Sequence, residues 1–148
     1  MGVTALAACS SGTGGTGPTP TPTAASTFVV EGSVAVESDF VANMQADNTT
    51  LDGPCAVKAG YDDIKGGAQV VVLDAAGSTV GLGTLATVTL DLPDGTTSLA
   101  SAFCRATFRV VDVPAGSDFY AIQIASRDPY RLTAADARKP VELSLGDL

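Results

Sequence analysis

The chain has 148 residues, 45% of them hydrophobic and 16% charged, which is typical of a single folded domain and excludes a wholly disordered protein. Asp plus Glu number 16 against 8 Lys plus Arg, so the formal net charge is -8. The basic residues are scattered and form no stripe for phosphate contacts, and we therefore expect no nucleic-acid partner. The acidity is interpreted as a means of keeping a secreted domain soluble.

Residues 6–9, Leu-Ala-Ala-Cys, have the form of a bacterial lipobox, in which two small residues precede a cysteine. In such a motif Cys9 takes a diacylglycerol before a signal peptidase makes it the new N-terminus. We interpret residues 1–9 as the remnant of a lipoprotein signal peptide. Only eight residues precede Cys9 and none is basic, whereas a signal peptide begins with a basic region followed by about 7 to 15 apolar residues. Met1 is therefore interpreted either as an internal start or as a position inside the apolar region of the signal peptide. The alternative is an incidental cysteine in a disordered tail.

Residues 10–27 contain only Ser, Thr, Gly, Pro and Ala, and are predicted to form a disordered tether. A mixture of coil and polyproline II would span about 25 to 55 Å. No other segment approaches the roughly 18 apolar residues that cross a bilayer, so membrane attachment would come through the lipid. The expected location is the extracytoplasmic face of the cell membrane.

Residues 28–148 are predicted to form one domain, because alternation with a period of two runs through most of this part of the chain. The predicted strands are residues 28–37, 68–74, 79–91, 99–113, 118–127 and 141–145. Gly81 and Gly83 indicate a bulge or bend in the third of them. A short helix is predicted at residues 134–138, since Thr133 and Asp136 resemble a capping box and Pro140 would end it.

Short strands separated by Gly, Pro and Asp turns predict an all-β fold with two packed antiparallel sheets. An immunoglobulin-like or a transthyretin-like sandwich would fit, and a small barrel is the alternative. The order of the strands is not predicted.

The two cysteines of the body, Cys55 and Cys104, form an even pair once Cys9 is assigned to the lipid. In an exported protein such a pair predicts a disulfide, and Cys104 is expected to point inward beside Phe108. Zinc is disfavoured, because the chain has no His and no Cys-x-x-Cys spacing.

The body resembles a group of actinobacterial exported proteins of unknown function. The shared positions run from about residue 55 to 146 and appear here as Cys55, Gly60-Tyr61-Asp62-Asp63-Ile64, Gly66 or Gly67, Val70-Val71-Val72-Leu73-Asp74, Gly77, Cys104, Phe108-Arg109-Val110, Val113-Pro114 and Phe119-Tyr120. The chain departs from that group at Ala59, where a second glycine is common. The resemblance implies a secreted domain with a structural disulfide and brings no known activity.

The loop at residues 60–67 is the first candidate ligand site, because glycines enclose Tyr61 and the adjacent carboxylates Asp62 and Asp63. In a structural interpretation the carboxylates bond loop amides, while Tyr61 and Ile64 close one end of the core. Alternatively, the carboxylates hold Ca²⁺ with backbone carbonyls, or an exposed Tyr61 contacts a partner. Calcium needs roughly six to eight oxygens, which favours the structural interpretation.

A second candidate is the segment 127–131, in which Arg127, Tyr130 and Arg131 could bind an anionic or sugar ligand. The alternative is an ordinary charged turn with a contact between Arg127 and Asp128. A glycosylation sequon begins at Asn48, and in a bacterial product it is interpreted as chance.

Catalysis is not expected, because a chain without His cannot form a Ser-His-Asp or Cys-His arrangement. Asp62 and Asp63 are adjacent, and neighbours on an extended chain point to opposite faces. We expect no enzyme, no cofactor and no metal.

Two non-catalytic functions are left as hypotheses. The first is a monomeric, lipid-anchored binding module for an envelope protein or polysaccharide, which predicts an exposed apolar or aromatic patch near Tyr61 or Tyr130. The second is a spacer or surface-blocking lipoprotein of phage or prophage type, acting in superinfection exclusion, which predicts a smooth acidic surface.

Overall fold

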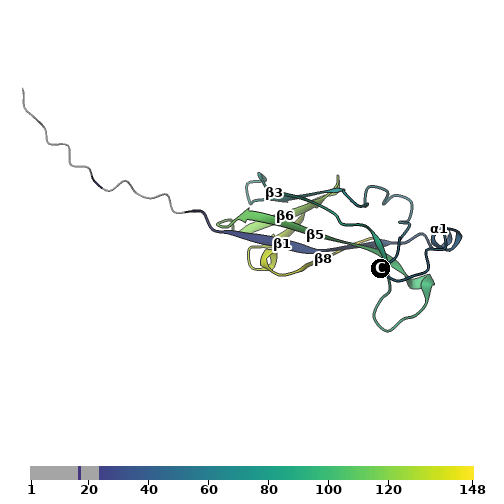
Figure 1. Cartoon of the computed structure of the whole chain (residues 1–148). Coiled ribbons are helices and arrows are strands. Elements are labelled where there is room, and N and C mark those ends of the chain that lie inside the picture. The colour runs from purple at the N-terminus through teal and green to yellow at the C-terminus, as the bar shows by residue number, and fades with distance from the viewer. Residues whose placement is uncertain (1–16, 18–23) are drawn as a thin grey trace, which may run out of the picture.

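The computed structural model describes Gly17 and residues 24–148, and its body is a two-layered β-sandwich (Figure 1). One sheet has the strand order β4-β5-β1-β8 and the other the order β3-β2-β6-β7. The elements are β1 (Thr27–Glu37), α1 (Phe40–Gln45), β2 (Gln69–Leu73), β3 (Thr79–Thr84), β4 (Thr89–Asp91), the 3₁₀ helix η1 (Leu99–Ser101), β5 (Phe103–Pro114), β6 (Phe119–Ile124), β7 (Tyr130–Thr133), the 3₁₀ helix η2 (Asp136–Arg138) and β8 (Val141–Leu145). The predicted all-β, two-sheet sandwich is confirmed.

The core follows from the alternation along the strands, because every second side chain faces the opposite sheet. Val30, Val34 and Val36 of β1 are fully buried, and so are Val70 and Val72 of β2. Alternate residues of β5 and β6 complete the same cluster: Cys104, Ala106, Phe108, Val110, Tyr120, Ile122 and Ile124. The two apolar faces thus pack against each other, as the sequence predicts.

Strand β1 lies inside its sheet, antiparallel to β5 and parallel to β8. In the constant-type immunoglobulin order the first two strands share a sheet, whereas here β1 and β2 lie in different sheets. The strands also divide into two separate sheets, which rules out the small barrel as a description of the fold.

The segment predicted as one strand at residues 79–91 forms two, β3 and β4, and passes from one sheet to the other. Leu85 bridges to Phe108 of β5, and the Ala86 amide donates to the Thr107 carbonyl at 2.8 Å. A register shift in β3 falls beside Gly81, where a bend is predicted. A Cβ at Gly81 would lie 2.7 Å from Val110 Cγ1, so glycine there permits close approach of β3 to β5.

The helices differ from the prediction in two respects. The helix predicted at residues 134–138 is the single turn η2, and Thr133 Oγ1 donates to Asp136 Oδ2 at 2.8 Å while accepting from the Asp136 amide. Helix α1, which begins after Asp39 and ends at Gln45, was not predicted from the sequence. Among the described residues, no helix has the length and apolar character required to span a membrane.

Candidate functional site

Cys55 and Cys104 are joined in a disulfide, with their Cα atoms 5.7 Å apart. Cys104 lies on β5 and is fully buried, while Cys55 lies in the segment between α1 and β2. The predicted bond is therefore confirmed, and Cys104 faces the core as expected. It fastens the long connection after α1 to the centre of one sheet. Cys9 lies outside the described residues.

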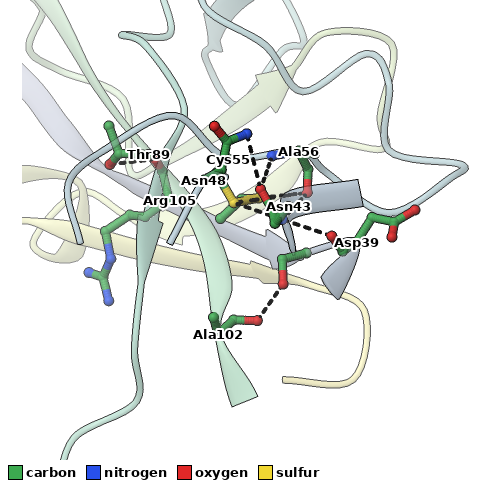
Figure 2. The surroundings of a disulfide bond; sticks show 10 residues. Asp39, Asn43, Asn48, Cys55, Ala56, Thr89, Ala102 and Arg105 are labelled. Carbon is green, nitrogen blue, oxygen red and sulfur yellow. Dashed lines mark hydrogen bonds between the residues drawn. A yellow bond between two sulfur atoms is a disulfide. The ribbon is translucent and has the colours of Figure 1, made fainter. Parts of the chain in front are cut away.

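A buried amide lies beside this disulfide and has no counterpart in the sequence analysis (Figure 2). Asn43 of α1 is only 4% exposed. Its Nδ2 donates to the Asp39 carbonyl at 2.8 Å and to the Ala56 carbonyl at 3.0 Å, and its Oδ1 accepts from the Ala56 amide at 2.7 Å. Since Ala56 follows Cys55, the amide and the disulfide together hold α1 against the sandwich.

Three of the six predicted ligand residues meet in one ion-pair cluster. Arg127 Nε donates to Asp63 Oδ2 at 2.9 Å, and Arg127 Nη2 donates to Asp63 Oδ1. The same Nη2 donates to the Gly60 carbonyl at 2.7 Å, and the guanidinium lies over the Tyr61 ring at 5.0 Å. Hydrogen bonding to Arg127 lowers the pKa of Asp63, and the same bond raises the pKa of Arg127. The cluster therefore joins the 60–67 loop to the turn after β6.

This arrangement favours the structural interpretation of the 60–67 loop. Both Asp63 carboxylate oxygens accept hydrogen bonds from Arg127. The positive charge of that guanidinium would repel a cation bound to the same carboxylate. Asp62 is exposed and accepts only a long bond, 3.3 Å, from the Gly60 amide. Ile64 is buried and Tyr61 packs against the core, as that interpretation predicts. In the part of the chain that the structure describes, no three or more metal-ligating side chains gather.

Tyr130 and Arg131 belong to β7 and not to a loop with Arg127, which corrects the prediction of a five-residue loop. Tyr130 pairs with Ile122 of β6, and Arg131 pairs with Ala121 of the same strand. Arg131 lines a hollow of about 530 Å³ together with Leu73, Phe119 and Ala121. Arg127 thus forms an ion pair with Asp63, whereas Arg131 lines a hollow at the surface.

A set of apolar side chains lies around α1, and we call it the distal patch: the exposed Phe40, Val41, Met44 and Ala100, and the half-buried Leu99. Phe40 is 44% exposed, Val41 60% and Met44 49%. Phe40, Val41 and Ala100 line a hollow of about 550 Å³, and Phe40 and Met44 line a smaller one with Leu99. The spacing of Phe40, Val41 and Met44 behind the N-cap Asp39 is the sequence signal that indicates this surface.

Comparison of the chain with family models, with curated proteins and with solved structures finds no match.

Proposed function

We propose that this protein is a lipid-anchored, non-catalytic interaction module of the bacterial cell envelope, attached through Cys9 to the extracytoplasmic face of the membrane. The sequence supports the anchor with a lipobox and a tether that contains no large apolar residue. The disulfide between Cys55 and Cys104 agrees with an oxidising compartment.

The observation that carries the proposal is the distal patch and its position. Strand β1 begins at one end of the sandwich, and α1 lies at the other end (Figure 1). A module that is anchored at one end and apolar at the other presents that apolar surface away from its point of attachment. Clustered exposed apolar side chains mark interaction surfaces more often than scattered ones do.

The patch also bears on the alternative of a spacer or blocking lipoprotein. A spacer gains solubility from a smooth acidic surface and has no use for exposed Phe, Val and Met side chains on one helix. The interaction module is therefore the function that the described surface favours. The distal patch centres on α1, whereas the sequence predicts a patch near Tyr61 or Tyr130; Tyr130 and Phe119 are also exposed, on β7 and β6.

The test compares the wild-type chain with Cys9→Ser in the native host. We expect the wild type in the membrane fraction, Cys9→Ser released from it, and the same envelope partner retained by both forms in a pull-down. Retention by neither form would remove the support for an interaction module. A biological effect that is lost in Cys9→Ser but survives Val41→Glu would favour the spacer.

A further inference from the structure

Helix α1 has six residues, too few to be stable by itself in water. Its position is fixed by contacts at its base: the buried Asn43 amide, the Cys55–Cys104 disulfide, and a hydrogen bond of 2.6 Å from Ser38 Oγ to the Ala102 carbonyl. The last contact joins the start of α1 to the end of η1. The two short helices that carry the distal patch are thus held together as one surface.

This fixed surface contributes little to the core, because Asn43 is the one buried residue of α1 and η1 has none. A covalent bond and a satisfied buried amide therefore hold a short helix whose apolar side chains face solvent. A surface that is already ordered loses less conformational entropy when a partner binds.

The charge around the patch is mostly negative. The segments that carry it, residues 38–57 and 92–102, contain Asp39, Asp47, Asp52 and Asp94 but no Lys or Arg. Asp147 lines the same hollow as Phe40 and Val41. The one basic side chain on that hollow is Lys58, and its Nζ lies 2.6 Å from a Glu37 carboxylate oxygen.

We infer that the distal patch docks a protein surface with an apolar centre and a rim of Lys and Arg side chains. This inference rests on the proposed function and names its partner's chemistry. Complementary charge around an apolar centre speeds association and rejects partners of the same sign. The surface of a bilayer rich in anionic lipid would be repelled by the same carboxylates.

The test is photocross-linking of the full chain in its native host, with a benzophenone side chain at Val41. The matched control carries the benzophenone at Leu82, which is also 60% exposed but lies on β3, in the sheet that does not contain β1. We expect a discrete protein adduct from the Val41 position alone, and the cross-linked segment should hold basic residues around apolar ones.

A charge-reversal pair adds the electrostatic part of the test. Asp47→Lys combined with Asp94→Lys should lower the adduct yield about fivefold. Asp118→Lys combined with Asp128→Lys changes the net charge equally, lies outside the patch segments and should leave the yield unchanged.

Each other outcome overturns the inference. These are an adduct to lipid or glycan, an acidic cross-linked segment, equal yields at the two positions, or no response to Asp47→Lys with Asp94→Lys. An adduct from the Leu82 position alone would rule out docking at the distal patch and leave the proposed interaction module standing. The absence of adducts from both positions would count against both.

Discussion

At the scale of the residue, the pair formed by Asp63 and Arg127 decides how the 60–67 loop is interpreted. The two side chains are 30% and 29% exposed, so solvent screens the charges but does not remove the geometric benefit of two parallel hydrogen bonds. Arg127 also satisfies the Gly60 carbonyl and covers the Tyr61 ring. Arg127, which lies outside the 60–67 loop, therefore holds that loop in place through its contacts with Asp63, Gly60 and Tyr61.

Asp63→Asn should lower the free energy of unfolding by about 1 kcal/mol at neutral pH, because the charge-assisted part of the pair is lost. The pKa of Asp63 is depressed below its ordinary value of 3.8, so its contribution is present in full well above that pH. The contribution is lost as pH falls below 3.8 and through the folded-state pKa. Urea unfolding as a function of pH would measure this. Asp62→Asn is the control and should leave the free energy of unfolding unchanged at neutral and at acidic pH. An equal effect of both variants would contradict the account.

Asn43→Ala should destabilise the protein by about 2 to 3 kcal/mol, because it leaves the amide and carbonyl of Ala56 without their buried partner. Chemical denaturation measures the loss, and hydrogen exchange should show faster exchange in α1. Asn48→Ala serves as the control, since the Asn48 side chain makes only a 3.5 Å hydrogen bond, to Asn43 Oδ1. If Asn43→Ala were as stable as Asn48→Ala, Asn43 would not hold α1.

Residue-scale prediction from sequence succeeded for the disulfide and failed for the ion pair. Two body cysteines admit a single pairing within the chain. Asp63 and Arg127 each have several possible partners, and 64 residues separate the two that meet. Asn43 gave no signal because an Asn among apolar residues is equally compatible with an exposed turn.

At the scale of the element, the disulfide couples the segment after α1 to β5. The half-cystines are 49 residues apart, and closing a loop of that length should stabilise the fold by about 4 kcal/mol in the chain-entropy model. The order of α1 depends on the same bond.

Cys55→Ser combined with Cys104→Ser, in a Cys9→Ser background that removes the remaining thiol, should unfold at a clearly lower urea concentration than Cys9→Ser alone. The loss expected is about 4 kcal/mol. Hydrogen exchange should accelerate most in residues 38–57, while β6 keeps its protection until global unfolding. Uniform acceleration in all strands would show that the bond does not act locally on the α1 end.

The strands were predictable to the extent that their alternation is strict. The observed β1 (Thr27–Glu37) and β8 (Val141–Leu145) match the predicted residues within one position. Strand β7 was missed because Pro129 directly before it indicated a loop, and α1 was missed because six residues are too short for helical periodicity to stand out.

At the scale of the whole molecule, alternation predicted the two-sheet class but not the strand order. The parallel pairing of β1 with β8 joins the two ends of the domain, and no local pattern encodes a contact of that range. One residue is consistent with it: a Cβ at Gly32 would clash with the Val141 carbonyl oxygen. From sequence alone that glycine has many explanations, so the strand order could not be predicted.

The central claim is that the chain is held to the membrane through Cys9 and presents its opposite end to a partner. Intact-mass spectrometry of the protein extracted from membranes of its native host tests the anchor most directly. The account predicts a mature chain that begins at Cys9, bears a diacylglyceryl group on that sulfur, and has a body two hydrogens lighter than its reduced form. An unmodified Cys9 with residues 1–8 still attached would contradict it.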